Sequence, residues 1–224
     1  MKKQPAINDL LQVMAKLRSP EGCPWDREQD HQSLRRHAVE EVYELIDAIE
    51  AGDDHEMAEE LGDLLLQVVF HCQLAGERGA FDFERVTRLI VEKLIRRHPH
   101  VFGDTKVRNV DEVWANWEKI KKAEKDGTKH ERASVLDGIP RHLPALARAE
   151  KLVKKARKAK LLPAAAPVRR RLTKAALAGE LFALAESAQA HGWSAEELLA
   201  TEVKKREKKL RRLEVKNTGL QKPG

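Results

Sequence analysis

Four acidic residues, in two pairs, have the spacing that a divalent cation site requires. Glu41 and Glu44 are three residues apart, and so are Glu60 and Asp63. Residues three apart share one face of an α-helix, so each pair is predicted to project from one side of its helix. If the two helices pair antiparallel, the four carboxylates converge beside leucines, where repulsion and desolvation destabilise their charged forms. An all-oxygen cluster favours a hard cation such as Mg²⁺ or Mn²⁺.

Two alternatives to a Mg²⁺ or Mn²⁺ site remain open from the spacing alone. Glutamates on helices usually form a solvated face, and we accept that interpretation for the acidic residues near the predicted turn: Glu50, Asp53, Asp54 and Glu56. A di-iron bundle is the rival metal site, but it requires Glu-x-x-His twice. The only such motif is Glu28–His31, outside both helices.

A carboxylate-bound metal indicates a phosphate-bearing substrate, because Mg²⁺ often binds through a few carboxylates together with substrate phosphates. Lys93 and Arg97 lie one turn apart and are candidates to hold the phosphates. Cations near a helix C-terminus are equally expected for stability alone. Trp117 and Lys121 are also one turn apart, and the indole is a candidate either to stack on a base or to fill the core.

Helical periodicity of the apolar residues predicts an all-α fold, and no segment alternates as a strand would. The acidic pairs are expected on two antiparallel helices, 33–50 and 55–75, joined by a four-residue turn. Further helices are predicted over 5–18, over 82–97, from 111, and over 145–160, 170–190 and 194–214.

The net charge of the 224-residue chain, +6, conceals two opposed parts. Residues 1–130 hold 20 Lys and Arg against 26 Asp and Glu, a net of −6, whereas residues 131–224 hold 22 against 10, a net of +12. Overall basicity therefore does not predict that the whole chain binds nucleic acid. The basic part leaves one alternative function open, a nucleic-acid or protein-interaction module, although it contains no zinc-ligand spacing and no Gly-rich RNA motif.

The two cysteines indicate a reducing compartment. Cys23 and Cys72 belong to no metal or disulfide motif, so reduced thiols are expected. No apolar stretch of signal-peptide length follows the start of the chain. The most apolar run, 64–75, is too short and too polar to span a bilayer. We therefore expect a cytoplasmic protein with no membrane contact.

Several motifs surround the acidic pairs. Glu40-Glu41-x-x-Glu44 is followed, after 15 residues, by Glu60-x-x-Asp63. The flanking motifs are Gly22-Cys23-Pro24-Trp25-Asp26, Gly62-Asp63-Leu64-Leu65-x-Gln67, Arg96-Arg97-His98-Pro99 and Trp117-Glu118-x-Ile120-Lys121. Together they resemble the MazG family of nucleoside triphosphate pyrophosphohydrolases, and the likeness extends from about Leu10 to Ala156.

The resemblance implies a MazG-like helical bundle whose four-helix active unit is usually completed by a homodimer. It also implies Mg²⁺-dependent hydrolysis of NTPs or dNTPs to monophosphate and pyrophosphate, with attack at the α-phosphorus. Carried over by motif position, the metal ligands are Glu41, Glu44, Glu60 and Asp63. The acids that would orient or deprotonate the attacking water are Glu40 or Glu59. The substrate-binding residues are Lys93, Arg97, Trp117 and Lys121.

The C-terminal part resembles an eroded second copy of the same domain. The place of the first acidic pair holds Pro163, Pro167 and Arg169-Arg170-Arg171, and the second place keeps only Glu180. We therefore predict a MazG-like catalytic domain over 1–125, a linker over 126–144, and a non-catalytic, basic helical repeat over 145–224. Because the second copy carries the activity in some two-repeat relatives, this departure leaves open whether the first copy is fully active.

Overall fold

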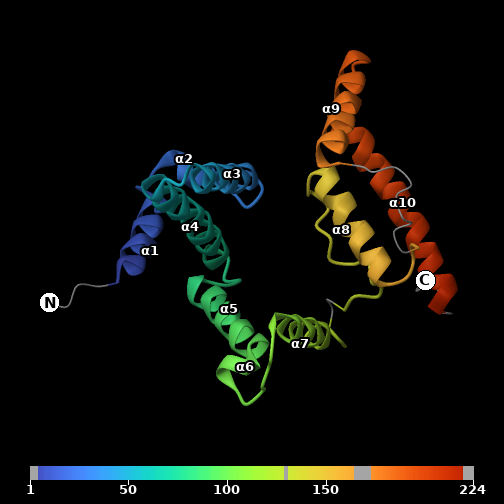
Figure 1. The fold of residues 1–224 in the computed structure, drawn as a ribbon. Coiled ribbons are helices and arrows are strands. Elements are labelled where there is room, and N and C mark those ends of the chain that lie inside the picture. The colour runs from blue at the N-terminus through green and yellow to red at the C-terminus, as the bar shows by residue number, and fades with distance from the viewer. Residues whose placement is uncertain (1–4, 129–130, 164–172, 219–224) are drawn as a thin grey trace. The chain divides into compact units, whose positions relative to one another are not determined.

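The computed structural model describes residues 5–128, 131–163 and 173–218, and all regular secondary structure in these ranges is helical. The all-α prediction is therefore confirmed for the described residues. The chain divides into two compact units, residues 1–120 and 121–224. The helices labelled in Figure 1 are α1 (Ala6–Leu17), α2 (Pro24–Glu28), α3 (Arg35–Ala51), α4 (Asp54–Glu77), α5 (Phe83–Arg97), α6 (Pro99–Phe102), α7 (Val110–Ala123), α8 (Ala145–Lys158), α9 (Lys174–Ala190) and α10 (Ala195–Thr218).

A tight turn between α3 and α4 builds the hairpin that carries the acidic pairs. Gly52 ends α3 with a φ of 69°, in the left-handed region that glycine adopts without strain. Asp53 then caps α4, and its carboxylate accepts the backbone N–H groups of His55 and Glu56. The connection is only two residues long, so the helices are antiparallel neighbours packed against each other (Figure 1).

The core of the first unit forms where α1 packs on the C-terminal half of α4. Its buried members are Met14, Leu34, Val69, Phe70 and Leu74. Arg18, just after α1, donates to both carboxylate oxygens of Glu77 at 2.6 and 2.7 Å, and its guanidinium lies 5.6 Å from the Phe70 ring centroid. Asp63 precedes Glu77 by 14 residues, about 21 Å along a helix axis at 1.5 Å per residue. The apolar core and the Glu60–Asp63 pair therefore occupy different halves of α4.

The core of the second unit lies between α8 and α10. Its buried members are Leu136, Leu152, Ala156, Val203 and Leu210. Leu136 is 1% exposed and belongs to the segment 126–144 that the sequence predicts as a linker. Part of that segment is therefore packed into the second unit, because its apolar residue completes the α8–α10 core.

Two short helices occur in segments for which the sequence predicts no helix. Each begins with a proline, Pro24 in α2 and Pro99 in α6. Proline fits the first position of a helix because its missing N–H would have no intrahelical partner there. At the other end of the chain, α10 continues to Thr218, four residues beyond the predicted end at residue 214. None of the helices in the described ranges combines the length and apolar content needed to cross a membrane.

Candidate metal centre

The α3–α4 hairpin brings three of the four predicted metal ligands together. One carboxylate oxygen from each of Glu41, Glu60 and Asp63 lies within 4.8 Å of the others. Glu41 lies on α3 and the other two on α4, so the antiparallel pairing is what joins them. Glu44 is outside this group of three, but it is close enough to Glu41 and Glu60 to repel both charges. The arrangement can hold a cation of the size and hardness of Mg²⁺.

The electrostatics of this cluster favour neutralisation. Partial burial raises the pKa of Glu41 above its ordinary value, and the charges of Asp63, Glu44 and Glu60 raise it further. The pKa of Glu60 is raised in the same way, first by desolvation and then by Glu44 and Asp63. Each shift means that the charged form of the carboxylate is destabilised, first by desolvation and then by repulsion from its acidic neighbours. A divalent cation offsets this destabilisation, because it attracts all of the carboxylates.

Gln67 is a neighbour of the cluster that the sequence reasoning did not assign to the site. It lies on α4 one turn after Asp63, and its residue is 8% exposed. Its side-chain Nε2 donates to Glu41 Oε1 at 3.4 Å. Its Oε1 is buried and has no hydrogen-bond partner within the part of the chain that the structure describes. The i to i+4 spacing from Asp63 was the signal that could have placed this glutamine at the site.

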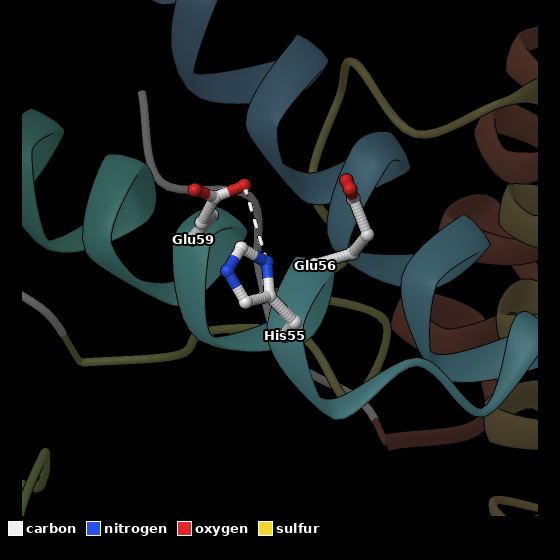
Figure 2. Close-up of side chains that lie close together, drawn as sticks. All are labelled: His55, Glu56 and Glu59. Atoms are coloured by element: carbon white, nitrogen blue, oxygen red, sulfur yellow. Dashed lines mark ion pairs between the residues drawn. The ribbon is translucent and has the colours of Figure 1, made fainter.

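The two candidate water-activating acids lie at the surface. Glu40 Oε2 is 3.3 Å from His37 Nδ1, and Glu59 Oε2 is 3.7 Å from His55 Nδ1. Their side chains are 63% and 61% exposed. Figure 2 shows Glu59 with His55 and Glu56 on the first turns of α4, and these three exposed residues could also approach one cation. Acidic residues are ordinary at a helix N-terminus, where they oppose the positive end of the dipole.

The four predicted substrate-binding residues lie on α5 and α7. The guanidinium of Arg97 sits 5.1 Å from the ring centroid of Trp117, which joins one residue of each helix in a cation–π contact. Lys93 is exposed one turn earlier on α5, and Lys121 lies one turn after Trp117 on α7. The sequence paired these residues within each helix, whereas the structure adds the contact across the two helices.

In the second unit, several acidic residues hold the fold together. Glu207 accepts from Arg148 at 2.6 Å, and Asp137 accepts from Arg211 at 2.8 Å. Glu214 accepts the backbone N–H of residue 135 at 2.8 Å. Within the described residues of this unit, no three potential ligands come close enough to share a cation. Of the basic and proline substitutions that indicated an eroded site, Pro167 and 169–171 lie outside the described residues.

Comparison with known proteins identifies the family of the segment that carries the acidic pairs. A profile of the MazG nucleotide pyrophosphohydrolase domain matches residues 29–102. These residues belong to the MazG family. The matched MazG domain includes the whole α3–α4 hairpin and α5, and therefore every predicted metal ligand together with Gln67, Lys93 and Arg97. The recognition made from the sequence motifs is thus confirmed.

Three curated relatives extend the comparison beyond the MazG domain. "Nucleoside triphosphate pyrophosphohydrolase/pyrophosphatase MazG" of Thermotoga maritima is 51% identical over 146 residues, which cover 65% of this chain and 54% of that protein. "Nucleoside triphosphate pyrophosphohydrolase" of Escherichia coli K12 is 49% identical over 150 residues, covering 66% and 56%. "Uncharacterized protein YabN" of Bacillus subtilis is 51% identical over 142 residues, covering 63% and 28%. The chain thus spans between about a quarter and just over half of the length of these relatives.

Proposed function

We propose that this chain hydrolyses nucleoside triphosphates, ribo or deoxyribo, to the monophosphate and pyrophosphate, and thereby removes unwanted nucleotides from the pool. The observation that carries the proposal is the convergence of Glu41, Glu60 and Asp63 within 4.8 Å, inside a MazG domain. Two relatives that share about half of their aligned residues with this chain are named for that activity. Glu44 supplies a fourth carboxylate beside the same cluster.

The residues present fit Mg²⁺, with Mn²⁺ as a substitute. All donors are oxygens, which hard cations prefer. The buried Gln67 Oε1 faces no donor among the described residues, and Mg²⁺ usually keeps several waters that can donate to such an acceptor. When bound, the cation supplies Lewis-acid polarisation of the phosphate oxygens and neutralises the charge of the leaving pyrophosphate. The carboxylates orient it, and the raised pKa values of Glu41 and Glu60 support this proposal, since a cation stabilises their charged forms.

We assign the remaining roles to the other residues that the family motifs single out. Glu40 or Glu59 accepts a proton from the attacking water, and each is next to a histidine that can hold its orientation. Lys93 and Arg97 neutralise the outer phosphates. Trp117 and Lys121 lie near the base or its phosphates; the Arg97–Trp117 contact supports a shared role for α5 and α7.

We further propose a homodimer in which a second copy covers the hairpin. The α3–α4 hairpin leaves large apolar side chains 38–55% exposed: Val39, Val42, Tyr43, Ile46, Ile49, Leu61, Leu65 and Val68. Apolar patches of this kind mark protein interfaces, and two hairpins packed together make a four-helix bundle. Analytical ultracentrifugation is expected to give the mass of two 25.4 kDa chains. A monomer at micromolar concentration contradicts this proposal.

We propose no catalytic role for the second unit, in line with the predicted boundaries 1–125, 126–144 and 145–224. The competing function, a nucleic-acid or protein-interaction module, would use the basic face of α10. Arg211 on that face is hydrogen-bonded to Asp137 and Glu207, so the positive charge of this residue stabilises the fold of the second unit. The free thiols of Cys23 and Cys72 support a cytoplasmic setting.

The test is to incubate the purified chain with each NTP and dNTP, in Mg²⁺ or in EDTA, and to separate the products by ion-exchange chromatography. Monophosphate and pyrophosphate formed only with Mg²⁺ support the proposal. Diphosphate and phosphate contradict it.

A further inference from the structure

Gln67 occupies a position where an apolar residue would be expected. The residues that follow it on α4, Val69 and Phe70, are buried in the core of the first unit. Gln67 is 8% exposed, a burial that glutamine seldom has without polar partners. An apolar side chain of similar size would fill the same space without a desolvation cost. An amide at this buried position therefore needs hydrogen-bond partners for both its NH₂ group and its oxygen.

One end of the amide has such a partner. Nε2 donates to Glu41 Oε1 at 3.4 Å, and this fixes the orientation of the amide, because its oxygen would be repelled by the carboxylate. The bond restrains the Glu41 side chain, which projects from the opposite helix. A hydrogen bond of this kind holds a metal-ligating carboxylate in a single orientation before the cation arrives.

The other end of the amide has none. Gln67 Oε1 is buried and unpaired within the described residues. Leaving a buried acceptor unsatisfied is costly. Asp63 precedes Gln67 by one turn of α4, so the amide lies beside the carboxylate cluster. A water on a cation held by Glu41, Glu60 and Asp63 is the donor that this position lacks, since Mg²⁺ keeps several of its waters.

We propose that Gln67 is a positioning residue of the metal site: its amide N–H orients the Glu41 carboxylate, and its amide oxygen accepts a hydrogen bond from a cation-bound water. This inference rests on the proposed function, since it presupposes that the cluster binds a divalent cation. Residues that orient metal ligands in this way typically change metal affinity about 10–100-fold when replaced. Gln67 thus adds a polar group to the site without adding a charge.

The test measures Mn²⁺ binding to the full-length chain, without nucleotide, by electron paramagnetic resonance. Gln67→Met keeps the length of the side chain and removes both polar atoms, and it is expected to raise the Kd for Mn²⁺ about 10–100-fold. The matched control is Gln73→Met, also on α4, which removes a Gln–Glu hydrogen bond of 3.1 Å to Glu77 outside the site. The control is expected to bind Mn²⁺ with the wild-type Kd.

The thermal stability of the metal-free chain separates this role from a purely structural one, for which Gln67→Met would lower the unfolding midpoint and leave the Kd for Mn²⁺ unchanged. Thermal unfolding in EDTA is expected to give Gln67→Met a midpoint equal to or above the wild-type value, because an unsatisfied buried acceptor has been removed. A lowered midpoint with an unchanged Kd overturns the proposal. If Gln67→Met does not fold, Gln67→Asn keeps the polarity and withdraws the amide by one methylene, and it too must weaken Mn²⁺ binding. A wild-type chain that binds no Mn²⁺ refutes the metal site itself, whereas equal binding by wild type and variant refutes only the role of Gln67.

Discussion

Replacing Glu207 with glutamine is expected to destabilise the second unit and leave the metal site intact. Glu207 accepts from Arg148 at 2.6 Å and from Arg211 at 2.7 and 3.1 Å, so one carboxylate neutralises two guanidinium groups. The Arg148 side chain is 9% exposed and that of Glu207 17% exposed. Arg148 Nε is already buried without a partner among the described residues. A neutral glutamine would leave this guanidinium buried without its counter-charge.

The size of the effect follows from this burial. Removing one partner of a buried ion pair costs about 3–5 kcal/mol. We expect the lower end, about 3 kcal/mol, because glutamine keeps one acceptor oxygen for Arg148. Arg211 also retains its contact with Asp137 at 2.8 Å. Because each 1.4 kcal/mol is a factor of ten, the open population of the second unit rises about 100-fold.

Hydrogen-exchange mass spectrometry of peptides from α8 and α10 measures this change directly, because exchange follows the free energy of opening. The matched control is Glu202→Gln, also on α10, whose side chain is 41% exposed and bonds Arg206 at 2.8 Å. Exposed pairs contribute little, so the control is expected to exchange as wild type. Both variants should keep the wild-type Kd for Mn²⁺. Wild-type exchange rates in Glu207→Gln would refute the view that acidic residues of this unit serve its fold.

Three further outcomes are expected. Burial and the nearby His31 lower the pKa of His71 below 6.5, so the unfolded chain binds the proton more tightly than the folded chain. The free energy of unfolding therefore falls as the pH drops below 6.5. In urea titrations, His71→Gln should weaken this dependence of stability on pH, whereas the exposed control His55→Gln should keep it. Asp63→Asn should fold, by circular dichroism, yet lose Mg²⁺-dependent turnover, and a folded variant with full turnover would refute its role as a ligand. Deleting 165–224 should retain part of the turnover, and loss of activity without a change in assembly would contradict a non-catalytic second unit.

The sequence predicted the hairpin well because its determinants are local. Gly52 and Asp53 supply the left-handed residue and the cap that a tight turn needs, and apolar periodicity marks the helices on either side. Once the helices are antiparallel, the i to i+3 spacing brings Glu41 to Glu60 and Asp63. The convergence of these three carboxylates was thus predictable from helix geometry and one turn.

The features that the sequence did not predict depend on contacts between distant residues. The buried state of Gln67 follows from packing across two helices, which periodicity within one helix does not reveal. Leu136 was assigned to a linker because it lies between a charged segment, 123–133, and the turn residues that begin at Asp137, but its side chain completes a core formed by α8 and α10. The contact of Arg97 with Trp117 likewise joins residues 20 apart. Each of these three features depends on tertiary contacts that a local sequence pattern does not reveal.

The most direct test of the account is hydrolysis of a triphosphate in H₂¹⁸O with Mg²⁺, followed by ³¹P NMR. Attack of water on the α-phosphorus, at a cation held by Glu41, Glu44, Glu60 and Asp63, predicts ¹⁸O in the monophosphate and none in the pyrophosphate. Label in the pyrophosphate, or release of diphosphate and phosphate, would contradict the proposed reaction.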